Sequence, residues 1–192
     1  MKASRTLILV SLLIIILSVS CKKKKIPTTV IPETLSIGTA YQGGKIAYIR
    51  QPGDIGYDAN VQHGIIAATS DQSTGAEWGY YGSLISGADG QSIGAGPQNT
   101  IDIINGCLTP GIAADICGDL VLFGYTDWYL PSKDELQKLF ANQVAIGFTP
   151  TGTVWYWSST EFDANTARVQ STLVQSILSK SQTAYVRAVR SF

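Results

Sequence analysis

The sequence predicts an α+β domain built from short helices and short strands that are joined by long connections. In several runs apolar and polar residues alternate, which is the period of a half-buried strand. Three other segments carry the residues that start and stop helices. All 19 glycines lie beyond Ser36, which favours turns and irregular connections over a helical bundle.

Two strands and one long loop are predicted in the first half of the domain. Residues 45–51 alternate and end at Pro52-Gly53, which is a turn signal. Residues 63–70 form a short apolar run that is typical of a buried strand. Residues 75–96 are rich in glycine and show no sustained period, so we expect a loop there.

Three helices are predicted in the middle of the chain. The first, at residues 97–105, begins with proline and is followed by glycine. The second, at residues 112–120, has apolar residues at helical spacing. The third follows Ser132 and Glu135, which we predict to form a structural capping box ahead of an apolar stripe.

Strands are predicted again in the last quarter of the chain, at residues 154–159, 167–171 and 184–189. Residues 169–179 also fit a helix, because apolar residues recur there every four positions. In the first of these strands, Trp155 and Trp157 are expected on one face and Tyr156 on the other. We expect Trp157, like Trp128, to be a structural core residue.

The first 36 residues have the organisation of a sorting segment. Lys2 and Arg5 precede an apolar run at residues 7–17, and small residues lead to Cys21. This pattern is typical of a secretory signal peptide, which we place at residues 1–20. A short uncleaved membrane anchor is the alternative, although a spanning helix needs about 20 apolar residues.

The residues before Cys21 resemble the lipobox of bacterial lipoproteins, with Ser18 in the position usually held by leucine. The resemblance implies that Cys21 is lipidated and that membrane lipid is a partner. It further implies a bacterial outer membrane lipoprotein that faces the periplasm or the cell surface. Residues 21–36, with four lysines and then Pro and Thr, are interpreted as a tether between lipid and domain.

The net charge of zero combines two opposite parts. The chain has 14 Lys and Arg and 14 Asp and Glu, and six of the basic residues lie in residues 1–32 with no acid beside them. Residues 33–192 therefore carry 8 basic and 14 acidic groups, a net charge of −6. This balance excludes a broad basic surface for nucleic acid, so no nucleic-acid partner is expected.

The residues offer little for catalysis, and we predict neither an enzyme nor a bound cofactor. His63 is the single histidine, and no nucleophile-elbow, phosphate-loop or zinc-helix motif occurs. Two acidic pairs, Asp54 with Asp58 and Asp71 with Glu77, were weighed as calcium ligands. Scattered loop acids are usually solvated, so no metal site is predicted.

Cys107 and Cys117 lie ten residues apart in a chain that we expect to be exported. A disulfide bond is the natural pairing in that setting. Two free thiols that bind a metal are the alternative, but further ligands are lacking.

Three ordered motifs resemble the Lcl C-terminal domain family. They are Asp-Trp-Tyr-Leu-Pro-Ser at residues 127–132 with Glu135-Leu136, Tyr-Trp-Ser-Ser-Thr-Glu at 156–161 and Tyr-Val-Arg-Ala-Val-Arg at 185–190. Upstream, Tyr-Gln-Gly-Gly at 41–44 and the run at residues 63–72 resemble the N-terminal half of longer members, so the resemblance covers roughly residues 36–192. It implies a C-type lectin-like fold with twisted, mainly antiparallel sheets, two or three short helices and long loops. This fold is distantly similar to sulfatase-modifying enzymes, whose late cysteines are absent here. We assign residues 37–192 to this domain.

The namesake of that family contributes to binding sulfated glycans, so the resemblance implies adhesion and carbohydrate binding. The domain is also rich in aromatic and neutral polar residues, which suits sugar rings, and its acidity favours neutral over sulfated glycans. A protein–protein interaction module of the envelope is the alternative. The candidate ligand-binding residues are Trp78, Tyr80, Tyr81, Trp155 and Tyr156.

Arg187 lies on a predicted strand near the end of the chain. A buried arginine must be paired, because an isolated charge in the interior is strongly destabilising. We therefore expect Arg187 to have a structural role, as the partner of Glu135 or Asp134.

Overall fold

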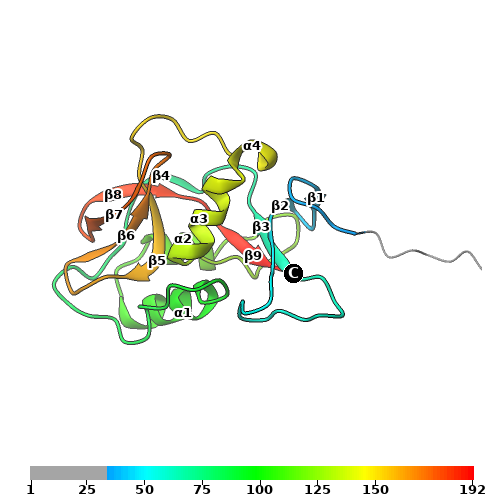
Figure 1. Cartoon of the computed structure of the whole chain (residues 1–192). Helices are drawn as coiled ribbons and strands as arrows, with labels where there is room; N and C mark the ends of the chain where they lie inside the picture. The colour runs from blue at the N-terminus through cyan, green and yellow to red at the C-terminus, as the bar shows by residue number, and fades with distance from the viewer. Residues whose placement is uncertain (1–33) are drawn as a thin grey trace, which may run out of the picture. The chain divides into compact units, whose positions relative to one another are not determined.

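Two β-sheets with helices packed against them make up the computed structural model, which describes residues 34–192 (Figure 1). These residues form one unit of the chain. The predicted signal peptide at 1–20, the lipidation site Cys21 and all but the last residues of the 21–36 tether lie outside the described residues. Within residues 34–192, no helix has the length and apolar character to cross a membrane.

The first sheet has four antiparallel strands in the order β1-β2-β3-β9. Its strands are β1 (Ala40–Tyr41), β2 (Gly44–Ile49), β3 (Gly64–Ala67) and β9 (Val189–Ser191). Every residue of β3 is buried, as its apolar run predicted. The last strand of the chain thus pairs with one of the first, and Tyr129 bridges to Val189 on its other side.

The second sheet has five strands in the order β4-β8-β5-β6-β7, and all pairs are antiparallel except β5 with β8. Its strands are β4 (Ser73–Glu77), β5 (Tyr156–Glu161), β6 (Thr166–Gln170), β7 (Gln175–Ser179) and β8 (Thr183–Val186). The strand β7 corrects the helical alternative for residues 169–179. Val169 lies in β6, Leu173 in the turn that follows and Ile177 in β7, so their spacing does not belong to one element.

Four helices occur in residues 34–192: α1 (Gly96–Gly106), α2 (Ala113–Gly118), α3 (Lys133–Ala141) and α4 (Gln143–Ile146). The first three confirm the predicted helices, whereas the single turn α4 was not predicted. The capping box of α3 is confirmed, because Ser132 Oγ accepts from the Glu135 backbone N–H and Glu135 Oε2 accepts from the Ser132 N–H at 2.8 Å. The fold class is therefore α+β with mainly antiparallel sheets, as predicted.

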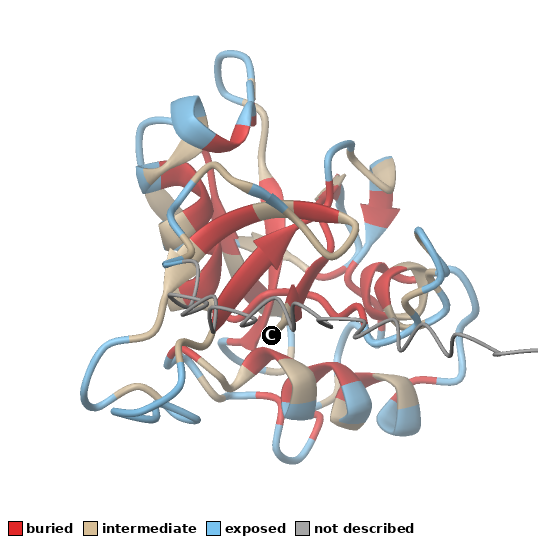
Figure 2. Cartoon of the chain, turned by 90° about the vertical axis from the view of Figure 1, so that its right-hand side faces the viewer, coloured by how far each residue is buried: buried red, intermediate tan, exposed pale blue. Residues whose placement is uncertain are grey.

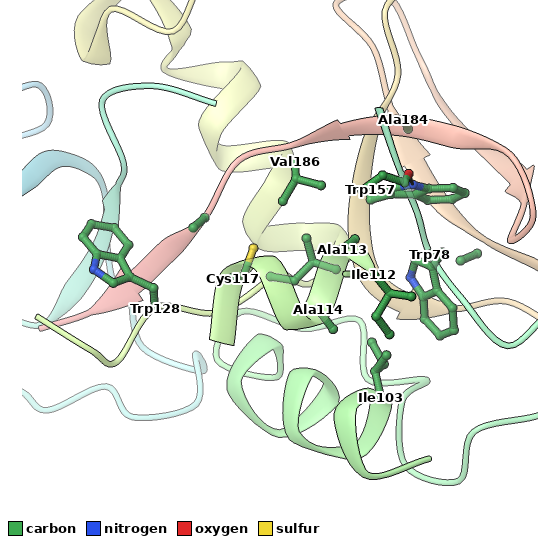
Figure 3. Close-up of a cluster of buried hydrophobic side chains, with 14 of the residues drawn as sticks. Trp78, Ile103, Ile112, Ala113, Ala114, Cys117, Trp128, Trp157, Ala184 and Val186 are labelled. Carbon is green, nitrogen blue, oxygen red and sulfur yellow. Dashed lines mark hydrogen bonds between the residues drawn. The ribbon is translucent and has the colours of Figure 1, made fainter. Parts of the chain in front are cut away.

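Buried residues concentrate in the central strands, and exposed residues lie in the loops around them (Figure 2). The larger of two hydrophobic clusters contains Trp78, Trp128 and Trp157 together with side chains from α1 and α2 (Figure 3). The smaller cluster contains Tyr156 and side chains of α3. Trp157 and Tyr156 therefore lie on opposite faces of β5, as predicted, and both Trp128 and Trp157 are core residues.

The chain passes twice between the two sheets, and Arg187 ties the two crossings together. It lies between β8 and β9, its Nε donates to Asp71 Oδ1 at 2.7 Å, and its Nη1 donates to the Ala68 carbonyl at 2.8 Å. Asp71 and Ala68 belong to the other crossing, from β3 to β4. This ion pair corrects the predicted partner of Arg187. Glu135 is occupied elsewhere, because it caps α3 and also accepts from the Gly94 N–H.

The predicted disulfide bond is absent: Cys107 and Cys117 are both free and buried. A Cβ atom on Gly79 would lie 3.1 Å from Cys107 Sγ and 2.8 Å from Ile112 Cγ2, so Cys107 lies close to the start of α2. Cys117 lies five residues beyond Ile112, about 7.5 Å along the helix, so the two cysteines lie at opposite ends of α2. Burial instead raises the pKa of the Cys117 thiol, which keeps it protonated and unreactive.

Candidate functional site

Trp78 was predicted to be an exposed ligand-binding residue, and the structure corrects this. The side chain is fully buried, and its Nε1 donates to the Ser158 carbonyl of β5 at 2.9 Å. The indole belongs to the larger hydrophobic cluster.

Tyr80 and Tyr81 lie in the loop that follows Trp78, and 45% and 60% of their surface is accessible. Tyr80 has a left-handed backbone with φ of 55°. The Gly82 N–H donates to the Ala164 carbonyl at 2.9 Å, so this loop lies against the β5–β6 turn. Two of the predicted binding residues are thus available to a partner.

A buried ion pair between Lys180 and Glu161 holds this loop through hydrogen bonds to its backbone. The side chains are 0% and 5% exposed. Lys180 Nζ also donates to the Ser83 carbonyl at 2.8 Å, and Glu161 Oε1 accepts from the Ile85 N–H at 2.9 Å. Lys180 further lies 4.8 Å from the centre of the Trp78 ring. Glu161 was noted in the sequence only as the last residue of a family motif, and nothing there distinguishes Lys180, a lone lysine in a polar turn.

Trp155 and Tyr156 do not form a binding pair. Trp155 is half-buried and packs against the larger core cluster, whereas Tyr156 is only 2% exposed. The Tyr156 hydroxyl donates to Asp71 Oδ2 at 3.0 Å, and burial together with this carboxylate raises its pKa. The prediction for Tyr156 is therefore corrected: it is a core residue that supports the crossing between the sheets.

A different set of aromatic residues lines a hollow of about 510 Å³, which we call the aromatic pocket. Its aromatic members are Tyr41, Phe123 and Tyr125. The other lining residues are small or polar: Ala40, Gln42, Gly43, Gly44, Lys45 and Thr69. None of these residues was predicted to bind a ligand, because they come from three separate segments of the chain.

Two tight turns meet at this pocket. The turn between β1 and β2 has Gln42 and Gly43 at φ of 43° and 88°, and the turn bridged by Leu122 and Tyr125 has Phe123 and Gly124 at 53° and 83°. Two consecutive residues with positive φ are the mark of the two-residue hairpin turn that suits twisted strands. A Cβ atom on Gly43 would lie 3.2 Å from the Phe123 Cβ, so the turns abut and only glycine fits there.

Arg190 holds the two turns in place. Its Nε and Nη2 donate to the two carboxylate oxygens of Asp127, each at 2.8 Å, and its Nη1 donates to Gln42 Oε1 at 2.7 Å. The guanidinium also lies 4.0 Å from the centre of the Tyr125 ring. The hydrogen bond from Arg190 lowers the pKa of the Asp127 carboxyl. The wall of the pocket is therefore preorganised.

Backbone strain marks both exposed aromatic sites. Three residues other than glycine have positive φ in the described part of the chain, namely Gln42, Tyr80 and Phe123. A left-handed backbone is rare for bulky side chains and is often found at functional sites. Phe123 is nevertheless 72% exposed, so burial of its ring does not account for its position.

Two of the four acidic residues considered as calcium ligands, Asp54 and Asp71, bind other groups of the protein. Asp54 accepts hydrogen bonds from the Tyr48 hydroxyl and the Gln51 N–H. Burial of the Tyr48 hydroxyl, together with its hydrogen bond to this carboxylate, raises the pKa of Tyr48 to about 12. Asp71 binds Arg187 and Tyr156. No three His, Cys, Asp or Glu side chains cluster as a metal site within residues 34–192. His63 Nδ1 lies 3.0 Å from the Phe192 carbonyl.

Fold and site together define an α+β domain with two sheets and a preformed aromatic pocket. The chain belongs to the Lcl C-terminal domain family, whose model matches residues 67–190. No curated protein matches the chain. The matched segment includes Thr69, Phe123 and Tyr125 of the pocket, whereas the β1–β2 turn lies before it.

Proposed function

We propose that the protein is an exported, membrane-anchored lipoprotein whose domain binds a glycan or cell-envelope polysaccharide without catalysing a reaction. The observation that carries this proposal is the aromatic pocket, where the exposed ring of Phe123 stands on a strained turn beside Tyr41 and Tyr125.

The chemistry of the pocket suits a sugar. A sugar ring offers apolar C–H faces and a rim of hydroxyl groups, and small-molecule sites combine aromatic walls with a few placed polar groups. Here the rings supply the apolar surface, and Gln42, Thr69 and Lys45 supply hydrogen-bonding groups. The preorganised turns reduce the entropy that binding would otherwise lose.

The anchoring part of the proposal rests on the sequence of the leader. Cys21 would carry the acyl chains after removal of residues 1–20, and residues 21–36 would hold the domain away from the outer membrane. Adhesion to a glycan at the periplasmic or outer surface would follow from this arrangement.

A protein–protein interaction module of the envelope is the second candidate. The exposed loop that carries Tyr80 and Tyr81, which we call the tyrosine loop, favours it. Tyr80, Tyr81, Leu84 and Phe162 are all large, apolar and between 45% and 68% exposed. The hydrogen bond from Gly82 to Ala164 brings the two loops that carry them together. A cluster of exposed apolar side chains is a common mark of a protein interface.

One experiment separates the two candidates. The full chain, purified in mild detergent, is applied to a glycan array and to immobilised envelope polysaccharides. The test variant is Phe123→Ala, and the matched control is Tyr81→Ala, which removes another largely exposed ring from the other loop.

Saccharide binding that is weakened at least tenfold by Phe123→Ala and unchanged by Tyr81→Ala supports the aromatic pocket. Loss through Tyr81→Ala alone would move the saccharide site to the tyrosine loop. If no saccharide binds and an envelope protein binds only when Tyr81 is intact, the domain is a protein interaction module.

A further inference from the structure

A second hollow, of about 420 Å³, lies next to the aromatic pocket, and we call it the acidic pocket. Its lining residues are Ser70, Asp71, Gln72, Ile116, Asp119, Leu120, Val121 and Leu122. Like the aromatic pocket, it combines apolar side chains with a polar rim.

The two pockets are lined by adjacent residues on two segments of the chain. Thr69 lines the aromatic pocket and Ser70 lines the acidic pocket, whereas on the opposite wall Phe123 lines the first and Leu122 the second. Consecutive residues lie about 3.8 Å apart at Cα. The pockets are thus neighbours along one seam, between the segment that leaves β3 and the segment that follows α2.

The walls of the acidic pocket are fixed by groups outside it. Asp71 is held by Arg187 and Tyr156, and Gln72 Oε1 accepts from the Ala188 N–H. On the other wall, the Leu122 and Tyr125 backbones exchange two hydrogen bonds of 3.1 Å. The second pocket is therefore as preformed as the first.

The charges of the second pocket restrict what it can bind. Its charged members are Asp71, whose charge is balanced by the ion pair with Arg187, and Asp119, and no lysine or arginine lines it. Carboxylates accept hydrogen bonds from hydroxyl groups but repel carboxylate, phosphate and sulfate groups. Leu120 and Val121 beside them offer apolar surface, and Val121 is 67% exposed.

Resting on the proposed function, we infer that the two pockets are adjacent subsites of one groove for consecutive units of a linear saccharide. The unit in the aromatic pocket stacks on Phe123. The next unit lies against Val121 and donates a hydroxyl group to Asp119, so it carries no anionic substituent beside that carboxylate. The groove therefore selects an uncharged stretch within a polysaccharide over a single terminal sugar.

The test measures affinity against chain length. Neutral cello-, chito- and manno-oligosaccharides of one to six units are titrated into the full chain in detergent by calorimetry. The wild-type affinity is expected to rise at least tenfold between the shortest and the longest member of a bound series. Val121→Ala with Asp119→Asn should abolish this rise and leave the affinity for the shortest bound member unchanged.

Val144→Ala is the matched control, because Val144 is 91% exposed on α4 and lines neither pocket. Affinity that does not depend on length, or a rise that survives the double substitution, overturns the inference while Phe123-dependent binding still supports the proposed function. If no neutral member binds but acidic oligosaccharides bind through Phe123, the inference fails in the same way. If no saccharide of any length or charge binds, both fail.

Discussion

Trp78 and Trp157 donate their indole N–H groups to each other's segments. Trp78 Nε1 binds the carbonyl of Ser158, next to Trp157, at 2.9 Å, and Trp157 Nε1 binds the carbonyl of Ala76 in β4 at 2.8 Å. The strand β8 lies between β4 and β5 in the sheet, so the two indoles connect strands that are not neighbours. Trp78 is therefore a structural residue.

The substitution Trp78→Phe tests this role. It removes the donor to Ser158 and keeps most of the buried ring. We expect the free energy of unfolding to fall by about 1–3 kcal/mol, because a buried hydrogen bond is lost. Urea denaturation followed by circular dichroism measures the change. Saccharide affinity at the aromatic pocket should stay the same, and a loss of binding in a fully folded variant would return Trp78 to the ligand site.

Phe123→Gly separates function from stability. Glycine accepts the left-handed backbone that costs other residues about 1–2 kcal/mol. Since the ring is mostly exposed, we expect the unfolding free energy to be unchanged or raised by up to about 1 kcal/mol. Saccharide affinity should fall about tenfold, which corresponds to about 1.4 kcal/mol. A variant that is less stable and binds normally would show that Phe123 serves the fold.

Lys180→Met tests the buried ion pair. The substitution leaves the Glu161 carboxylate buried without its cation, which typically costs about 3–5 kcal/mol. Lys180→Met with Glu161→Gln removes both charges and keeps an acceptor for the Ile85 N–H, so it should cost less than the single change. Urea denaturation compares the variants, and limited proteolysis at Tyr80 and Tyr81 reports loosening of the loop. Equal stability of wild type and single variant would contradict the anchoring role.

Asp127 gives the fold a dependence on pH. Arg190 lowers the pKa of this carboxyl in the folded state, so ionised Asp127 stabilises the fold above its unfolded pKa of about 3.9. The contribution is lost as the pH falls through the folded pKa. The stability difference between wild type and Asp127→Asn should therefore be greatest near neutral pH and shrink below about pH 4. Thermal denaturation across this range measures it, and a constant difference would contradict the ion pair.

The substitution Lys45→Gln tests whether the aromatic pocket prefers neutral ligands. Lys45 is the single charged residue among those that line the aromatic pocket. If the first subsite takes a neutral sugar, Lys45→Gln keeps a hydrogen-bond donor and should change the affinity less than twofold. A loss of tenfold or more, relieved by added salt, would mean that the bound unit is anionic.

The parts of the fold that depend on neighbouring residues could be predicted from the sequence. The capping box of Ser132 and Glu135 fixes the start of α3 within four residues of chain. The opposite faces of Tyr156 and Trp157 follow from the period of a strand. By contrast, β4 was interpreted as part of a loop, because its sequence Ser-Thr-Gly-Ala-Glu is mostly polar and buries only Ala76.

The candidate site depends on contacts between distant residues. Arg187 meets Asp71 across 116 residues, and Arg190 meets Gln42 across 148, so neither partner could be chosen from spacing. One local signal was present. Glycine follows Gln42 and Phe123, and such pairs between short strands indicate tight turns. That the two turns abut is a property of the folded chain alone.

The pairing of β3 with β9 also constrains when the domain can fold. The four-stranded sheet is complete only when residues 64–67 pair with residues 189–191. Gly64 and Phe192 also exchange two backbone hydrogen bonds of 3.2 Å. Contacts of such long sequence separation slow folding, because a long loop must close first. The four-stranded sheet therefore cannot be complete until residues 189–191 have left the ribosome, long after β3 has been synthesised.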